Sequence, residues 1–324
     1  MLKRTSFLLV FAHLLVLTHY TYAVLVVPQS SGSYKFVTSW GSYGTGSGEF
    51  NVAYGIAIDS KGYVYVSDFY NHRIQKFTSN GAYISQWGSE GNDRGQFQRP
   101  THIAVDRAGY VYVTDYGNSR IQKFTDNGTF VTMWGADSPY GIAVDASGYV
   151  YVSSHFGNSV NKYTSDGTYI TGWGVAEYPN GIAVDSEGAV YVTDLYSQKV
   201  KMFSSEGALI DARDYYKIAY DVNIDQFGCV YITNNDDSST YKVQKFAADG
   251  TILTEWGIRG SGEGQFTNPY GIAVDSSGYV YVSDGDNHRV QKFIPEPTTF
   301  LLLSVGVLYF RRREKQQQMR TVSA

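Results

Sequence analysis

The sequence predicts an all-β protein, a closed ring of six four-stranded blades known as a six-bladed β-propeller, from three observations. A five-residue motif, Gly-Ile-Ala-(Ile/Val)-Asp, recurs along the chain with variants. Its aspartates follow one another at intervals of 39 to 50 residues, and a period near 40 residues built of short strands is typical of propeller blades. The segments between them alternate β-branched or aromatic residues with polar ones, and the body of the chain shows no sustained helical period.

Each repeating unit begins with the short apolar strand that holds the motif. The aspartate at its end opens a turn that a glycine closes, as in Asp59–Gly62, and an alternating Tyr-Val strand follows, as in Tyr63–Ser67. In such a turn a carboxylate accepts hydrogen bonds from backbone N–H groups, and glycine adopts the positive φ. We therefore interpret the six aspartates as structural and not catalytic. They are Asp59, Asp106, Asp145, Asp185, Asp225 and Asp275.

Two further strands complete each unit, as in Arg73–Phe77 and Tyr83–Trp87, and the fourth strand ends in Trp-Gly or a drifted form of it. A fourth-strand pattern, Phe36–Gly41, precedes the first unit, whereas the last unit stops at Phe293 without one. We therefore predict that the N-terminal strand completes the last blade. This closure leaves no long exposed sheet edge.

The third strands open with a motif that resembles the NHL repeat. It reads Asn71-His72-Arg73-Ile74 in the first unit and Asn287-His288-Arg289-Val290 in the last, with weaker forms between them. The Gly-rich loops before a phenylalanine also resemble that family, and they precede Phe50, Phe97 and Phe266. The resemblance covers about residues 35–294 and implies the propeller fold. It says little of function, because propellers serve both as binding modules and as enzymes. We expect the two motif histidines to form hydrogen bonds between strands.

Residues 1–23 have the layout of a secretory signal peptide. A short basic start is followed by an apolar run, Phe7–Leu17, and by the small residue Ala23. The alternative is an uncleaved membrane anchor, but the apolar run is shorter than the ~20 residues of a spanning helix. We expect residues 24–34 to be a short linker to the propeller.

Residues 295–324 resemble the PEP-CTERM sorting signal of Gram-negative bacteria. The segment begins with Pro295, Glu296 and Pro297, continues with an apolar run, and ends in a cluster of Arg311, Arg312 and Arg313. The resemblance implies an exosortase-type processing enzyme as a partner and transient membrane insertion. It also implies export across the inner membrane to the cell envelope, surface or extracellular matrix. The 13 residues Thr298–Phe310 form a helix of roughly 20 Å, against a hydrocarbon core of about 30 Å. A permanent C-terminal membrane tail is the alternative.

The distribution of charge argues against a nucleic-acid partner. Seven of the 26 Lys and Arg residues lie outside residues 24–294, whereas only two of the 30 Asp and Glu residues do. Affinity for nucleic acid depends mostly on neutralising phosphates, which this acidic body does not favour. The single cysteine, Cys229, excludes an internal disulfide and a multi-cysteine zinc site.

The mouth of the channel, where the first strands begin, holds the candidate ligand site. The candidate residues that precede the first strands are Tyr54, Tyr140, Asn180, Tyr220 and Tyr270. Those that follow the second strands are Asp68, Asp115, Asp194 and Asp284. Tyrosine rings supply apolar area and their polar tips give specificity, which suits a polysaccharide or protein ligand. The alternative is that these residues pack and cap the loops.

Two blades depart from the repeat at the channel mouth. His102 and Asp221 stand where the four other units have glycine, and their blades lie opposite each other in a ring of six. Together with His155 they form a possible metal site of the His/His/carboxylate type, as in the zinc-dependent amidating lyases, whose fold resembles NHL propellers. The alternative is that His102 and Asp221 reflect ordinary sequence variation between repeats. The sequence therefore predicts an exported binding or scaffold protein without cofactor or catalysis, with a metal-dependent lyase or lactonase-like hydrolase as the alternative.

Overall fold

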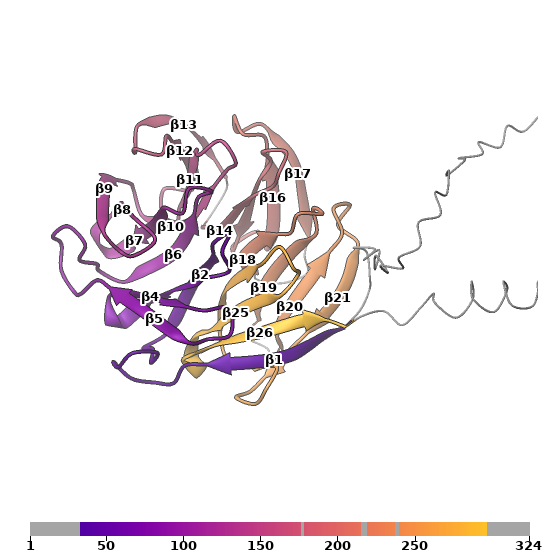
Figure 1. The fold of residues 1–324 in the computed structure, drawn as a ribbon. Coiled ribbons are helices and arrows are strands. Elements are labelled where there is room, and N and C mark those ends of the chain that lie inside the picture. Colours follow the sequence, from indigo (N-terminus) through magenta and orange to yellow (C-terminus); the bar gives the residue numbers. More distant parts are fainter. Residues whose placement is uncertain (1–32, 176–177, 215–218, 237–239, 297–324) are drawn as a thin grey trace, which may run out of the picture.

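The computed structural model describes residues 33–175, 178–214, 219–236 and 240–296. They form six four-stranded antiparallel sheets that follow one another around a ring (Figure 1). The predicted signal peptide, residues 1–23, and all of the sorting tail beyond Glu296 lie outside the described residues. Within the described part of the chain, no helix has the length and apolar character of a membrane span.

In the first five blades the strands run from the innermost to the outermost in chain order. The first blade consists of β2 (Ala53–Ile58), β3 (Val64–Asp68), β4 (Arg73–Phe77) and β5 (Tyr83–Trp87). The second consists of β6 (Pro100–Val105), β7 (Val111–Asp115), β8 (Arg120–Phe124) and β9 (Phe130–Gly135). The third consists of β10 (Pro139–Val144), β11 (Val150–Ser154), β12 (Ser159–Tyr163) and β13 (Tyr169–Gly174).

The fourth and fifth blades follow the same order, whereas the sixth takes its outermost strand from the start of the chain. The fourth consists of β14 (Pro179–Val184), β15 (Val190–Asp194), β16 (Lys199–Phe203) and β17 (Leu209–Asp214). The fifth consists of β18 (Ala219–Ile224), β19 (Val230–Asp236), β20 (Thr240–Phe246) and β21 (Ile252–Trp256). The sixth consists of β24 (Pro269–Val274), β25 (Val280–Asp284), β26 (Arg289–Pro295) and β1 (Tyr34–Trp40). Short elements in the loops are β22 (Ile258–Arg259), β23 (Gln265–Phe266) and the 3₁₀ turns η1 (Phe69–Asn71), η2 (Tyr116–Asn118) and η3 (Gly285–Asn287).

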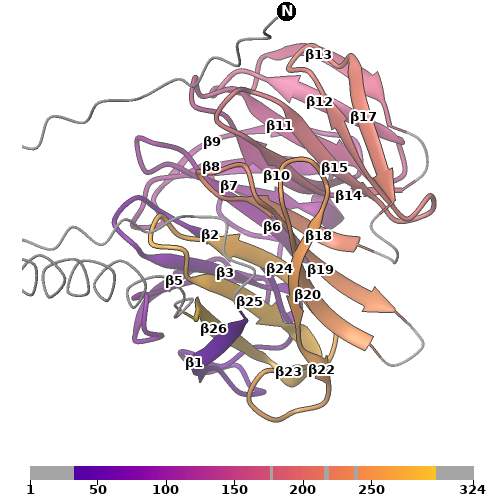
Figure 2. The same cartoon turned by 90° about the vertical axis from the view of Figure 1, so that its right-hand side faces the viewer.

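The structure confirms the predicted closure of the ring. Strand β1 pairs antiparallel with β26, with Tyr34 opposite Pro295 and Trp40 opposite Val290 (Figures 1 and 2). The ring of Tyr34 stacks on Trp256 of the fifth blade at 4.2 Å between centroids, and its hydroxyl lies 3.0 Å from that of Tyr231. The N-terminal strand therefore both completes the sixth blade and binds it to the fifth.

The repeated aspartates shape the turns, as the sequence predicts. Asp59 Oδ1 accepts hydrogen bonds from the backbone N–H groups of Lys61 and Tyr63, each at 2.9 Å. Its Oδ2 accepts one from the hydroxyl of Tyr65 at 3.0 Å. Four other turns repeat this arrangement, at Asp106, Asp145, Asp225 and Asp275. Each carboxylate thus ties a turn to the tyrosine of the second strand.

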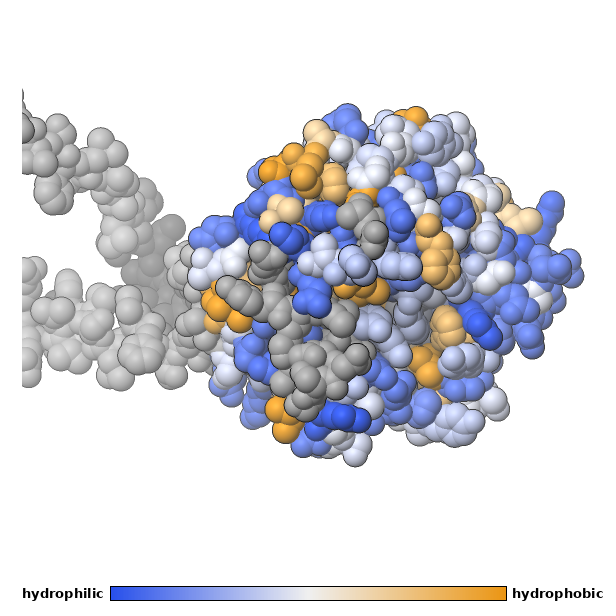
Figure 3. All heavy atoms as spheres, turned by 180° about the vertical axis from the view of Figure 1, so that it is seen from behind, coloured by the Kyte–Doolittle hydropathy of each residue, from blue (hydrophilic) through white to orange (hydrophobic). Residues whose placement is uncertain are grey.

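Loops connect the strands on two opposite faces of the ring. One face, here called the turn face, carries the turns between first and second strands and between third and fourth strands. The other, here called the loop face, carries the loops after the second strands and those that lead into the next blade. Both described ends of the chain lie at the turn face, where the N–H group of Glu296 donates to the carbonyl of Ser33 at 2.8 Å. The face seen in Figure 3 shows small apolar groups scattered among polar ones.

Neighbouring blades are locked by a tryptophan that packs against a glycine. The ring of Trp40 lies against Gly81, whose φ is +85°, and no side chain larger than hydrogen fits between the two. The same contact joins Trp87 to Gly128, Trp134 to Gly167 and Trp173 to Gly207. In the fourth blade the side chain of Arg213 takes the place of the indole. In the fifth, Trp256 meets Tyr34, because the last blade is assembled from both ends of the chain and has no such turn.

Replacing Gly81 with alanine is expected to destabilise the protein more than replacing Gly62. A Cβ at Gly81 would lie 2.5 Å from the Trp40 ring, whereas one at Gly62, with φ +83°, has no atom within 4 Å. Both substitutions bear the cost of a left-handed backbone, about 1–2 kcal/mol, and overpacking adds roughly 1–3 kcal/mol at Gly81 alone. Denaturant unfolding of the two variants measures the difference. Equal losses would show that the indole moves aside without cost.

Candidate functional site

A narrow cavity lies on the axis of the ring, between the six first strands. It measures about 170 Å³ and is lined chiefly by their alanine, isoleucine and valine side chains. Asn223 is the polar residue of this lining. Such a wall offers no acid, base or nucleophile, so any chemistry of the channel belongs to its mouth.

His102 and Asp221 meet at the loop-face end of this channel. The two residues come from opposite blades, as the sequence predicts, and His102 Nε2 lies 3.7 Å from Asp221 Oδ1. Both side chains are buried. Asp221 Oδ1 accepts a hydrogen bond from the N–H group of Val222 at 2.9 Å, and Oδ2 accepts one from Ile272 of the sixth blade at 3.0 Å. The carboxylate therefore joins the fifth blade to the sixth across the mouth.

Burial sets the protonation of this pair. It lowers the pKa of His102, with the charge of Asp221 and a backbone hydrogen bond acting in the opposite direction. Burial likewise raises the pKa of Asp221. His102 Nδ1 lies 3.0 Å from the carbonyl oxygen of Tyr140; since that oxygen only accepts, Nδ1 carries the proton of the neutral ring. Nε2 has no hydrogen-bond partner and faces the carboxylate.

The neutral state of His102 predicts a pH-dependent stability. Because its folded pKa lies below the unfolded value of about 6.5, the unfolded chain takes up a proton first as the pH falls. Stability is then lost below about pH 6.5, at up to about 1.4 kcal/mol per pH unit. His102→Gln is expected to have a shallower dependence between pH 7.5 and 5, measured as unfolding free energies. Parallel curves for the two proteins would contradict a neutral buried imidazole.

His155 does not join the pair as a third ligand. It stacks on Tyr140 at 4.9 Å, and its Nδ1 lies 3.3 Å from the carbonyl oxygen of Pro179. Among the described residues, no three His, Cys, Asp or Glu side chains gather into a group that could hold a metal ion. Of the three residues in the predicted metal site, the structure therefore brings His102 and Asp221 together but not His155.

The predicted tyrosines close the mouth above the pair. Tyr54 stacks on Tyr270 at 4.4 Å, and its hydroxyl forms a hydrogen bond with that of Tyr140. Tyr220 contacts Tyr270 edge-on at 5.5 Å, and Asn180 Nδ2 donates to the carbonyl of Tyr220 at 2.8 Å. Burial raises the pKa of Tyr54, Tyr140 and Tyr270, so these hydroxyls stay protonated. The sequence places these residues correctly at the mouth, where they pack against one another.

The predicted aspartates lie inside the blades. Asp68 is fully buried, and its Oδ2 accepts hydrogen bonds from Arg73 Nε at 2.8 Å and from Asn71 Nδ2 at 2.9 Å. The guanidinium of Arg73 also donates to the carbonyls of Thr45, Gly46 and Glu49 in the Gly-rich loop. The pairs Asp115–Arg120 and Asp284–Arg289 repeat this arrangement, and Asp194 pairs with Lys201.

These aspartate–arginine pairs lie within a known repeat, whose matched segments begin directly after the Gly-rich loops. The model of the NHL repeat matches residues 50–77, 97–124 and 266–293. The chain contains NHL repeats. Two curated proteins are similar in sequence to a part of this chain. The E3 ubiquitin-protein ligase TRIM71 of Rattus norvegicus is 34% identical over 64 residues, 18% of this chain and 8% of that protein. Protein lin-41 of Caenorhabditis elegans is 51% identical over 49 residues, 15% of this chain and 4% of that protein. The chain thus spans less than a tenth of these relatives.

Several solved structures, among them a WD40 propeller domain, are similar to this chain at low sequence identity. A streptogramin B lyase is 15% identical, with a TM-score of 0.59 over 81% of this chain and 98% of the other. A gluconolactonase from Xanthomonas campestris is 16% identical, with a TM-score of 0.63 over 85% and 94%. The WD40 propeller domain of Doa1 is 11% identical, with a TM-score of 0.58 over 82% and 98%. At such identities the likeness establishes the fold alone.

The histidines of the NHL motif form hydrogen bonds to the loops that lead into the next blade, and not between strands as the sequence predicts. His72 and His288 adopt left-handed backbone conformations at the ends of η1 and η3. His72 Nδ1 accepts a hydrogen bond from the N–H group of Arg99 at 3.1 Å, and His288 Nδ1 accepts one from Val52 at 3.2 Å. Both donors lie just before a first strand, so these imidazoles serve the contact between blades.

Sequence reasoning missed the exposed aromatic residues of the loop face. Tyr70, Phe156 and Tyr196 stand two positions after the last residue of a second strand, and Tyr178 precedes a first strand. Their exposed fractions run from 41% to 71%. Three of these residues share the same position relative to the second strand, and that was the sequence signal that could have revealed them. A single aromatic residue in a loop does not by itself indicate whether it is exposed. These residues, and not the buried aspartates, are accessible to a ligand.

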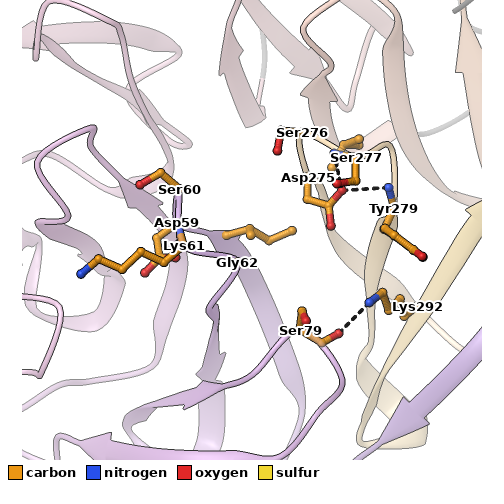
Figure 4. Close-up of a pocket in the computed structure, with 12 residues that line it drawn as sticks. Asp59, Ser60, Lys61, Gly62, Ser79, Asp275, Ser276, Ser277, Tyr279 and Lys292 are labelled. Carbon is orange, nitrogen blue, oxygen red and sulfur yellow. Dashed lines mark hydrogen bonds between the residues drawn. The ribbon is translucent and has the colours of Figure 1, made fainter. Parts of the chain in front are cut away.

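A cavity on the turn face lies between the first and sixth blades (Figure 4). It measures about 480 Å³ and is lined by Asp59 and Asp275 with several serines. Asp275 accepts hydrogen bonds from Ser277 and Tyr279 within its own turn, and Lys292 Nζ donates to the carbonyl of Ser79 at 2.9 Å. The charged groups of this cavity therefore serve the fold.

Proposed function

We propose that this protein is an exported binding or scaffold protein whose loop face engages a polysaccharide or a protein ligand without catalysis. The proposal rests on one observation: the channel mouth is closed by packed tyrosines and surrounded by exposed aromatic side chains. Tyr54, Tyr140 and Tyr270 close it above the buried pair of His102 and Asp221, while exposed aromatic side chains lie around it. Ligand contact on this face thus depends on aromatic surface, which suits recognition.

The position of the described chain ends supports a loop face that is free to contact a ligand. Ser33 and Glu296 are hydrogen-bonded at the turn face, so both described ends of the propeller lie on the side opposite the aromatic residues. If residues 295–324 act as a sorting signal read by an exosortase-type enzyme, the protein is held at the envelope by its turn face. The loop face then points toward the surroundings of the cell.

A second candidate is a metal-dependent lyase or lactonase-like hydrolase at the channel mouth. The pair of His102 and Asp221 favours it, because an imidazole nitrogen and a carboxylate are ligands that zinc prefers. Elemental analysis of the purified full chain tests this candidate. One equivalent of zinc per chain that disappears in His102→Gln would favour the enzyme, whereas the binding proposal requires no bound metal.

Binding is tested with extracellular matrix material from a bacterium that makes the protein. The labelled full chain is mixed with untreated matrix, with protease-treated matrix and with periodate-oxidised matrix. Retention on the untreated sample is expected. Its loss after periodate identifies a polysaccharide ligand, and its loss after protease identifies a protein. No retention on untreated matrix would contradict the proposed function.

A further inference from the structure

A continuous band of aromatic rings crosses the channel mouth on the loop face. It begins in the first blade with Tyr70 and Phe69, whose rings lie 4.8 Å apart, and Phe69 contacts Tyr54 at 5.1 Å. Tyr54 contacts Tyr140 of the third blade at 6.0 Å. From Tyr140 the band continues through His155 to Phe156 and Tyr178, at 4.9, 5.0 and 5.3 Å. We call these seven residues the aromatic band.

The aromatic band has two exposed ends joined by a packed centre. Tyr70 is 49% exposed at one end, and Phe156 and Tyr178 are 61% and 41% exposed at the other. Tyr54 at the centre is buried, so it supports the others and does not itself face solvent. A ligand that uses the whole band therefore meets two separate aromatic platforms, one at the first blade and one where the third blade meets the fourth.

The aromatic band is uncharged at neutral pH. Burial lowers the pKa of His155, so its imidazole is neutral. Burial raises the pKa of Tyr54 and Tyr140, so both hydroxyls keep their protons. A charged group that contacts the band is Arg99, whose guanidinium lies 5.9 Å from the centre of the Tyr70 ring. The polar edge of the band consists of hydroxyl and imidazole groups that form hydrogen bonds without net charge.

We infer that the aromatic band binds an uncharged polysaccharide chain, an inference that rests on the proposed function and specifies its ligand. A sugar ring has a C–H face that packs on an aromatic ring and hydroxyl groups that meet polar tips. A polysaccharide repeats this unit along its length, so one chain reaches both platforms. The second contact is then intramolecular, which raises the affinity for long chains without new types of contact.

The same geometry is less suited to the other classes of ligand. A protein interface of standard size needs about 800 Å² on each partner with an apolar centre, whereas the centre of the aromatic band is buried and its exposed rings lie at two separate ends. A nucleic acid would need basic residues along the band to neutralise its phosphates, and Arg99 touches only one end.

Affinity electrophoresis of the full chain tests the inference. The gels contain dextran, xylan or hydroxyethyl cellulose as uncharged polysaccharides, or alginate as an anionic one. We expect at least one uncharged polysaccharide to retard the protein. Tyr70→Ala and Phe156→Ala should each weaken that binding by about tenfold, the loss typical of an exposed aromatic anchor. Phe227→Ala is the matched control, because Phe227 is 55% exposed in a turn of the opposite face.

The length of the polysaccharide provides a second test. Because one chain spans both platforms, oligosaccharides of two or three sugars should bind far more weakly than the polymer, and the two alanine variants should reduce this difference. Retardation by alginate alone, equal retardation of wild type and both variants, or no retardation by any uncharged polysaccharide would overturn the inference. Matrix binding that survives periodate would leave the proposed function standing while this inference falls.

Discussion

Removal of residues 24–42 is expected to abolish cooperative unfolding of the propeller. The deletion takes away β1 and leaves β26 as an unpaired edge, and it uncovers the side of the fifth blade that Tyr34 contacts. Trp40 is lost as well, and with it the contact that joins the sixth blade to Gly81 of the first. A propeller is stable because its ring has no open edge, so the truncated chain should unfold gradually or aggregate.

Chemical denaturation followed by tryptophan fluorescence and circular dichroism measures this loss. The control lacks only residues 24–32 and keeps β1 intact, so it should unfold in one sharp transition like the full chain. A truncated protein without residues 24–42 that gives the same midpoint and slope would mean that β1 adds little to the closure of the ring.

The fold was predictable because its signals are local and repeated. The turn that begins at Asp59 and its counterparts are set by a carboxylate and a glycine a few residues apart, so a single chain displays the rule six times. Closure required only that strands be counted, since the pattern of Phe36–Gly41 stands before the first unit and is missing after the last. Local chemistry repeated in register therefore determined both the blades and their order.

The candidate site was predictable in position but not in composition. The residues before the first strands do meet at the mouth, because all six first strands begin on the same face. The sequence did not reveal in the same way that Asp68 pairs with Arg73. Arg73 also bonds to loop carbonyls 24 to 28 positions away, and this contact buries both charges. A count of acidic residues near the mouth therefore suggested a ligand surface where the fold forms ion pairs.

Residues that occur once in the repeat were the hardest to interpret. His102 and Asp221 could be placed in opposite blades by counting units. Whether they touch depends on the width of the channel, and that width is set by the close approach of the first strands at their glycines, such as Gly55 against His102 and Gly181 against Asp221. The aromatic band likewise depends on ring contacts between the first and third blades, which sequence spacing does not encode.

Replacing Asp68 with alanine is expected to destabilise the protein by about 3–5 kcal/mol, the usual effect of leaving one member of a buried ion pair alone. The change leaves the guanidinium of Arg73, 7% exposed, without its carboxylate, and the N–H group of Asn51 loses the acceptor that it meets at 2.8 Å. The loop that Arg73 organises leads into Phe50, which is buried in one cluster with Tyr281 and Val290 of the sixth blade, so the loss extends to the contact with that blade. Urea unfolding of the variant against wild type gives the difference in free energy.

The matched control is Asp211→Ala, which removes the carboxylate of the pair Asp211–Arg213. That carboxylate is 38% exposed and its partner 28%, and exposed pairs contribute at most about 1 kcal/mol. If Asp68 serves ligand binding and not the fold, the two variants will lose similar, small amounts of stability, and binding to matrix polysaccharide will fall in Asp68→Ala alone. If it serves the fold, as its buried partners indicate, stability falls steeply in Asp68→Ala, and the fraction that remains folded binds as wild type does.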